Sequence, residues 1–214
     1  MSVTVITISE MSAAAITVYD QGMGRWEPDA RGRLEGAAIA LYSERGFENT
    51  TVAEIAARAG LTERTFFRHF ADKREVLFWG ASALQELLVS AVADAPDSAA
   101  PLDAVATALE AAGAVLEERG EYSRQRQLVI AANADLRERE LIKLASLAAA
   151  LAAALRQRGV PGPAASLTAE AGIAVFKVAF EGWAAENNQR SLPHLIRDSL
   201  HELKAMGARG PAAG

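Results

Sequence analysis

The stretch NTTVAEIAARAGLTERTFFRHFADKREV, residues 49–76, decides the fold of this chain. Thr51 and Glu54 have the T-x-x-E spacing of a capping box, in which side chains satisfy the free N–H groups at the start of a helix. Gly60 predicts the end of that helix, because glycine adopts positive φ without a Cβ clash. The first half of the stretch therefore predicts a short helix followed by a tight turn.

A second helix is predicted from Thr62, its cap, to Phe70. Phe66 and Phe70 are four residues apart and would face the core, so the polar side chains between them face outward. Two short helices joined by a tight turn form the helix-turn-helix layout, whose second helix enters the DNA major groove. On this pattern alone, the alternative is an αα-hairpin with a solvated charged face.

The outward side chains of the second helix are suited to DNA. Arg64 matches the O6 and N7 atoms of guanine in a bidentate fork, and the methyl group of Thr65 can pack on a thymine methyl. Other side chains would hold the DNA backbone. These predicted backbone contacts are Thr51, Phe67, Arg68, His69 and Lys73.

The segment TTVAEIAARAGLTERTFFRHFADKREVLF resembles the signature of TetR-type transcriptional regulators, and the similarity extends upstream through Arg31–Gly46. The shared features are the three-residue turn, the aromatic–x–x–Phe ending and the D-K-x-x-L-x opening of the next helix. The family often has tyrosine where this chain has Phe67, which lacks a hydroxyl group for a phosphate. The resemblance implies a double-stranded DNA operator as partner.

Composition limits the other classes of function. The 214 residues include no cysteine, which excludes disulfides and thiolate metal sites and fits a cytoplasmic protein. No apolar run is expected to reach the length of a membrane span, and no signal peptide is predicted.

Charge is distributed unevenly along the chain, whose net charge is −5. Residues 31–74 hold eight basic and six acidic side chains, so this segment carries +2 and the remainder carries −7. A mildly basic DNA-reading part on an acidic body is the expected arrangement.

An all-α fold of about nine helices is predicted, with a three-helix head and a larger body. The expected parts are a flexible arm (1–28), the helix-turn-helix domain (29–74), a ligand-binding and dimerisation domain (75–207) and a disordered tail (208–214). Arg25, Arg31 and Arg33 at the arm could reach DNA, and a plain disordered tail is the alternative. The body helices are predicted at 72–93, 102–119, 121–132, 136–158, 164–189 and from Ser191 onward.

The last two helices carry smooth apolar stripes, which favour a homodimer built as a four-helix interface. Ordinary intramolecular core is the alternative. The predicted interface residues are Val175, Val178, Gly182, Leu195, Ile196, Leu200 and Leu203.

No catalytic set, metal site or cofactor motif is present in the sequence, so an enzyme is not predicted. His194 and His201 share a helix but lack the spacing and the glutamate of a zinc helix.

The TetR resemblance also implies a ligand pocket inside the body. The segment QRQLVIAANADLRERELIKLASLAAALAAALRQRGV, followed by AVFKVAFEGW, is similar to mycofactocin-system and acyl-CoA-responsive regulators. Aromatic side chains would line an apolar tunnel with a basic mouth; for each of them the alternative is core packing or a solvated arginine. The pocket residues are Phe78, Trp79, Arg124, Arg126, Arg137, Phe176, Phe180 and Trp183.

Together these features imply a repressor that a small hydrophobic effector, such as a fatty acyl-CoA, releases from its operator. The alternatives are a helical small-molecule-binding protein with a non-functional DNA-binding head, and a cofactor-free enzyme.

Overall fold

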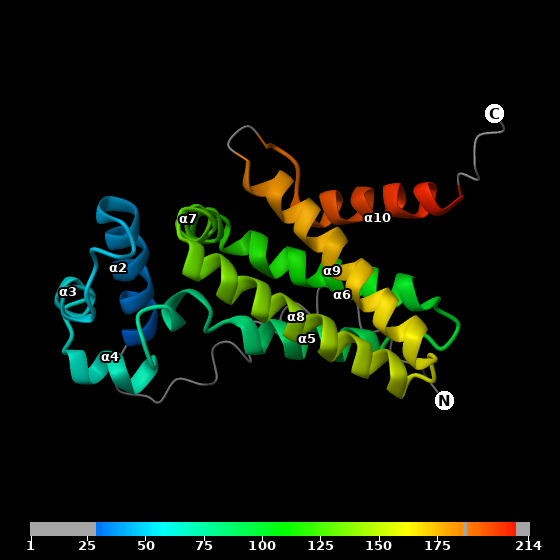
Figure 1. Ribbon diagram of the computed structural model, residues 1–214, viewed down its shortest axis with the longest axis horizontal. Coiled ribbons are helices and arrows are strands. Elements are labelled where there is room, and N and C mark those ends of the chain that lie inside the picture. Colours follow the sequence, from blue (N-terminus) through cyan, green and yellow to red (C-terminus); the bar gives the residue numbers. More distant parts are fainter. Residues whose placement is uncertain (1–28, 186–187, 209–214) are drawn as a thin grey trace, which may run out of the picture. The chain divides into compact units, whose positions relative to one another are not determined.

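The computed structural model describes residues 29–185 and 188–208, and every regular element within these residues is a helix (Figure 1). They divide into two compact units, the first ending at Ala83 and the second beginning at Leu84. We call them the head and the body. The expected arm, 1–28, and all but the first residue of the expected tail, 208–214, lie outside the described residues.

The head contains three α-helices and one 3-10 helix around a small apolar core. They are α2 (Ala30–Arg45), α3 (Val52–Arg58), α4 (Glu63–His69) and η1 (Glu75–Leu77). The centres of the core are Leu34 of α2, Ile55 of α3 and Phe66 of α4, each with no exposed surface. One large apolar side chain from each helix thus holds the three helices together.

The body is a bundle of longer helices. They are α5 (Ala81–Ala93, which starts at the end of the head), α6 (Pro101–Glu118), α7 (Gly120–Ala131), α8 (Ala134–Gln157), α9 (Gly162–Ala184) and α10 (Leu192–Ala208). Helix α9 packs against α6, α8 and α10, and α10 also packs on α6. Gly172 lets α6 approach α9, because a Cβ there would lie 2.5 Å from Cγ1 of Val105.

Two predicted helix boundaries are wrong. The helix expected over 72–93 is interrupted, since η1 ends at Leu77 and α5 starts at Ala81. The backbone N–H groups of Leu77, Phe78 and Ala81 donate to carbonyl oxygens three residues earlier, so the chain makes tight 3-10 turns here and not one continuous α-helix. The helix expected to reach residue 189 ends at Ala184, where Ala185 is extended.

Three residues predicted for the dimer interface belong to the core of the body. Val175, Ile196 and Leu200 are only 5%, 0% and 5% exposed. Cδ1 of Ile196 lies 2.8 Å from the position that a Cβ of Gly113 would take, so α10 is closely packed on α6 of the same chain. For these three residues the alternative of intramolecular core is the one found.

The expectation that no apolar run reaches the length of a membrane span also needs correction. In the described part of the chain, segments 75–93 and 162–184 pass by length and composition, although only a third of each is buried. The first is not one continuous α-helix, and the second, α9, packs against three helices of the body. Both read as apolar elements of a helical bundle.

Candidate nucleic-acid interface

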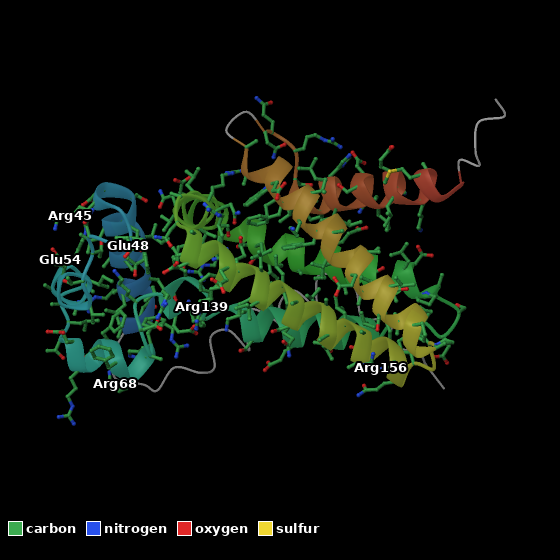
Figure 2. All side chains as sticks on the ribbon, viewed as in Figure 1. Arg45, Glu48, Glu54, Arg68, Arg139 and Arg156 are labelled. Atoms are coloured by element: carbon green, nitrogen blue, oxygen red, sulfur yellow. The ribbon has the colours of Figure 1, made fainter. Side chains whose placement is uncertain are left out.

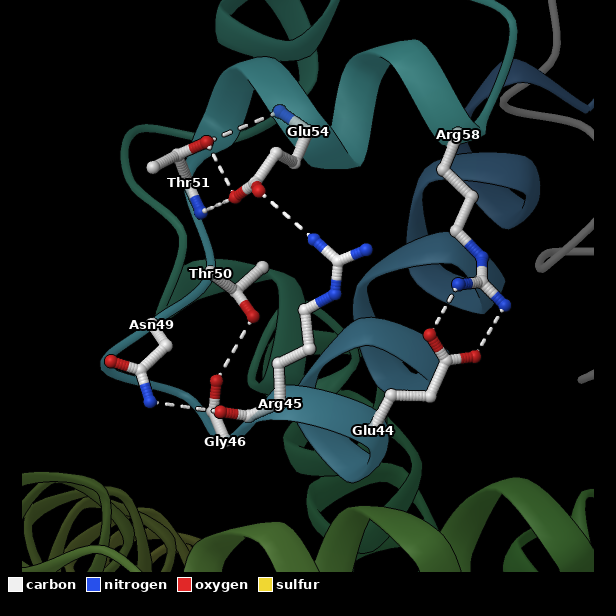
Figure 3. A network of polar contacts seen from close by, with 8 residues as sticks. All are labelled: Glu44, Arg45, Gly46, Asn49, Thr50, Thr51, Glu54 and Arg58. Atoms are coloured by element: carbon white, nitrogen blue, oxygen red, sulfur yellow. Dashed lines mark hydrogen bonds and ion pairs between the residues drawn. The ribbon is translucent and has the colours of Figure 1, made fainter.

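Helix α3 begins with a complete capping box (Figure 3). The backbone N–H of Thr51 donates to Oε2 of Glu54 at 2.8 Å, and the backbone N–H of Glu54 donates to Oγ1 of Thr51 at 3.2 Å. The Thr51 hydroxyl in turn donates to the Glu54 carboxylate at 2.8 Å. The proton with which Thr51 was predicted to contact DNA is thus used inside the helix cap.

The turn between α3 and α4 is a Schellman motif. The N–H of Gly60 donates to the carbonyl of Ala57 at 3.0 Å, and the N–H of Leu61 donates to that of Ala56 at 2.8 Å. Gly60 has φ of 67°, a value that a residue with a Cβ adopts only with strain. These bonds set the angle at which the second helix leaves the first.

Arg33 of α2 holds the same turn from outside. Its guanidinium donates to the carbonyl oxygen of Ala59 and, at 3.4 Å, to that of Gly60. A role for Arg33 in reaching DNA was considered above, but its Nη2 atom faces the turn. The contact joins residues 26 positions apart, so no local spacing in the sequence announces it.

Helix α4 presents a mixed basic and aromatic surface. Its cap, Thr62, accepts from the N–H of Thr65 at 3.2 Å. Of the side chains predicted to face outward, Arg64, Phe67 and Arg68 are exposed, with Phe67 at 55%, whereas Thr65 and His69 are partly buried. Within the described residues no ion pair is recorded for Arg64, so its guanidinium is free to meet a base.

Two ion pairs tie α2 to α3 on the side of the head away from α4. Arg58 donates to both carboxylate oxygens of Glu44 at 2.6 Å, and Arg45 donates to Glu54 at 3.0 Å (Figure 3). Figure 2 shows Arg45 and Glu54 together at this end and Arg68 at the other. Both pairs therefore link α2 to α3, and the bidentate one also fixes the orientation of the Arg58 guanidinium.

The Glu44–Arg58 pair predicts a pH-dependent contribution to stability. The hydrogen bonds from Arg58 hold the pKa of Glu44 below its usual 4.5. Because the pKa is lowered in the folded state, the contribution is present above pH 4.5 and is lost as the pH falls through the folded value. We expect Glu44→Gln to lower the urea midpoint at pH 7 and to have little effect at pH 3; an equal loss at both would contradict this.

Lys73 was predicted to contact a phosphate, and its contacts lead us to revise that role. Its ammonium group donates to the carbonyl oxygens of Phe47 at 2.9 Å, Glu48 at 3.3 Å and Thr50 at 3.0 Å. It also lies 4.4 Å from the centre of the Phe47 ring. An ammonium group has three N–H donors, and here all three are used on the loop that leads into α3.

Residues predicted for a ligand pocket lie in both units. Phe78, 3% exposed, and Trp79, whose ring lies 4.7 Å from the guanidinium of Arg31, belong to the head. In the body, Arg126 pairs with Glu140 at 3.2 Å. The remaining five side chains all lie on α7, α8 or α9.

The other body residues separate into a helix cap and a cluster. Arg137 donates to the carbonyl of Ala131 at 2.6 Å, at the end of α7. Phe176, Phe180 and Trp183 form a continuous row on α9, with neighbouring ring centres 5.7 and 5.5 Å apart. Arg124 lies 4.5 Å above the ring of Trp183. Of the predicted pocket, the structure thus brings Arg124 together with the aromatic row.

Comparison with known proteins now identifies the head. Residues 36–78 match the model of the family described as bacterial regulatory proteins, tetR family. The head is a TetR-type domain. The matched segment contains most of α2 and all of α3, the turn, α4 and η1, which are the elements whose geometry is given above.

Curated relatives resemble the TetR-type head and part of the body. The transcriptional regulator TcmR of Streptomyces glaucescens is 40% identical over 81 residues, which are 38% of this chain and 36% of that protein. The protein assigned as the mycofactocin biosynthesis regulator MftR of Mycobacterium tuberculosis is 30% identical over 113 residues, or 52% of this chain and 57% of that one. The chain therefore matches about a third to rather more than half of their lengths.

Solved structures extend the similarity in fold over both units of this chain. SmeT of Stenotrophomonas maltophilia, in complex with triclosan, has a TM-score of 0.62 at 23% identity and covers 84% of this chain and 91% of its own. FadR of Thermus thermophilus, with lauroyl-CoA, has a TM-score of 0.50 at 26% identity and covers 86% and 99%. The all-helical fold, with an N-terminal helix-turn-helix and a larger helical body, is thus the one these regulators share.

Proposed function

We propose that this protein is a sequence-specific DNA-binding regulator of transcription, in which the body controls the head through a small hydrophobic effector. The surface of helix α4 is the observation that supports this proposal most. The helix buries Phe66 and Phe70 and exposes Arg64, Phe67 and Arg68. The turn before it is held by a hydrogen bond from Arg33. A rigid short helix with a free arginine near its N-terminus is what major-groove reading requires.

The proposed roles follow from exposure. Arg64 and Thr65 read base edges, while Phe67 and Arg68 contact the sugar–phosphate backbone. His69, partly buried beside Phe70, supports the end of the helix as well as the backbone contact. Thr51 is the cap of the neighbouring helix, and its N–H and hydroxyl proton are both donated to Glu54, so it would contact a phosphate through a water molecule bound to its hydroxyl oxygen.

A homodimer would present two heads to one operator. The exposed face of α9 supports it, because small and apolar residues recur there every three or four positions, with Leu167 at 73% and Val178 at 63% exposure. The full stripe is Leu167, Ala171, Ala174, Val178 and Gly182. Small residues let two such helices pack closely across a two-fold axis.

We expect Val178→Asp to convert the dimer into a monomer, because it places a charge at the centre of that stripe and desolvation of an unpaired carboxylate is costly. Light scattering after size exclusion measures the mass. Glu181→Asp, one turn along the same exposed helix, is the control and should stay dimeric. A Val178→Asp protein that remains a dimer would move the interface away from this stripe.

The proposed effector occupies the body and shifts the balance between dimers that fit DNA and dimers that do not. The complexes of SmeT with triclosan and of FadR with lauroyl-CoA are examples of ligands with large apolar groups bound by proteins of this fold. We propose repression relieved by the effector, in the cytoplasm, where the operator lies.

A gel-shift titration tests the proposal. Full-length protein is titrated against the DNA upstream of its own coding region, and against DNA selected from a random pool, with excess random competitor. We expect a competitor-resistant shift on at least one of them, which then serves as the assay for effectors. If neither selection nor the upstream DNA yields a preferred sequence, the head does not read DNA and the protein is a ligand-binding helical protein.

A further inference from the structure

One face of α7 lies against the aromatic row of α9. Gly120, Arg124 and Gln127 recur at spacings of four and three, so they share this face. A Cβ at Gly120 would lie 3.5 Å from Cζ2 of Trp183, and the guanidinium of Arg124 lies 4.5 Å from the centre of that ring. The guanidinium of Arg124 therefore lies over the indole ring, and the ring packs close to the backbone of Gly120.

Two buried polar atoms, one on α9 and one on α7, have no hydrogen-bond partner in the described part of the chain. They are Nε1 of Trp183, in a side chain only 1% exposed, and Oε1 of Gln127. Buried donors and acceptors are nearly always paired, because each unpaired one costs about 1–3 kcal/mol. A donor and an acceptor are thus left ready for a bound molecule that offers the opposite groups.

Arg124 supplies the charge. Stacking on Trp183 uses the flat face of the guanidinium, so the N–H groups around its edge remain available. Within residues 29–185 and 188–208, no carboxylate forms an ion pair with Arg124. Arg126 and Arg137, by contrast, are committed to Glu140 and to the end of α7. One available cation suits a single carboxylate, whereas the several phosphates of a coenzyme A thioester need more.

We propose that this arginine–tryptophan face binds a flat aromatic carboxylic acid that carries a hydroxyl group. The carboxylate accepts from the edge of Arg124 and from the indole N–H of Trp183, and the hydroxyl donates to Oε1 of Gln127. The ring system packs against Phe180 and the half-buried Phe176. The face is defined as Gly120, Arg124, Gln127, Phe176, Phe180 and Trp183. The inference rests on the proposed function. It assigns hydroxylated aromatic carboxylic acids as the class of effector, where the sequence analysis expected an acyl-CoA.

Calorimetric titration of the full-length protein tests the assignment. The probes are 3-hydroxy-2-naphthoate and, as the partner without the carboxylate, 2-naphthol. We expect the naphthoate to bind at least about 10-fold more tightly, because a hydrogen bond to a charged group contributes about 1.5–3 kcal/mol. Arg124→Met should remove that difference by weakening the naphthoate alone.

The matched control is Arg156→Met, the same change at an exposed arginine in the last turn of α8 (Figure 2). It should leave both affinities unchanged. Trp183→Phe keeps an aromatic ring but removes the N–H, and it should also weaken the naphthoate more than the naphthol. Equal binding of both probes by the native protein, or no effect of Arg124→Met on the naphthoate, overturns the proposal.

A spectroscopic measurement on the native protein avoids dependence on the folding of the variants. In an NMR spectrum, the indole N–H signal of Trp183 should shift farther at saturating 3-hydroxy-2-naphthoate than at saturating 2-naphthol, which offers the same ring system but no carboxylate. Saturating naphthoate without movement of this signal would rule the face out.

The experiments distinguish failure of the proposed regulatory function from failure of the proposed binding site for an aromatic carboxylate. Binding of the naphthoate that depends on Arg124, in a protein for which no operator can be selected, would leave this inference standing and remove the regulatory function. An operator complex released by lauroyl-CoA, with no binding of the naphthoate, would do the reverse.

Discussion

Arg64→Ala should abolish most of the preference for the operator while changing binding to random DNA little. Arg64 is exposed in the first turn of α4. A bidentate contact to guanine contributes about 1–3 kcal/mol of discrimination, and a symmetric dimer makes it twice, so the loss is about 2–6 kcal/mol. That corresponds to about 30-fold or more in affinity. Fluorescence anisotropy with operator and scrambled duplexes, at several salt concentrations, measures both affinities.

Arg68→Ala provides the contrast, since Arg68 is exposed two residues before the buried Phe70 and is proposed to contact the DNA backbone. Arg68→Ala should weaken binding to the operator and to the scrambled duplex by similar factors, and it should reduce the salt dependence of binding. If Arg64→Ala instead lowers binding to the operator and the scrambled duplex by the same factor, then Arg64 does not read bases.

Lys73→Met should destabilise the head rather than remove a phosphate contact. The change leaves the carbonyl oxygens of Phe47, Glu48 and Thr50 without their donor and removes the cation beside the Phe47 ring. Hydrogen bonds to a charged group contribute about 1.5–3 kcal/mol each, and partial hydration of the freed carbonyls offsets some of this, so we expect a loss of about 2–4 kcal/mol. Urea unfolding followed by circular dichroism measures it.

The control for Lys73 is Lys204→Met, which removes an exposed lysine paired with Asp103 on the surface of the body. Surface pairs contribute about 0–1 kcal/mol, so its midpoint should barely move. At a temperature where the Lys73→Met head is folded, the slope of DNA affinity against salt should equal that of the native protein. If Lys73→Met keeps the native stability but its salt slope is reduced by one phosphate contact per head, then Lys73 does contact a phosphate.

The helix-turn-helix could be predicted because its signals are local. Thr51 and Glu54 are three residues apart, and their capping box forms as the spacing requires. Gly60 sits at the positive φ that the turn needs, and Phe66 and Phe70 face the core from one side of α4. Each of these features is decided by residues within one helical turn of each other, where geometry follows from sequence spacing alone.

The break between η1 and α5 shows the limit of periodic patterns. Residues 72–93 carry an apolar stripe that fits one helix, yet the core of the head takes Val76, Leu77 and Phe78 together. Tight turns, in which Leu77 donates to Arg74 and Phe78 donates to Glu75, replace continuous α-helical hydrogen bonding there. Only the shape of the surrounding core contains that information.

The sequence by itself determined an all-helical chain with a helix-turn-helix head, because capping, turn and amphipathic signals act over three or four residues. Only the tertiary structure decided what the charged side chains do. Lys73 binds carbonyls between 23 and 26 residues away, and Arg33 reaches the turn 26 residues on. Arg124 meets Trp183 on another helix, two elements later in the chain. A long flexible side chain has several partners within reach, and the packing of distant helices selects one of them.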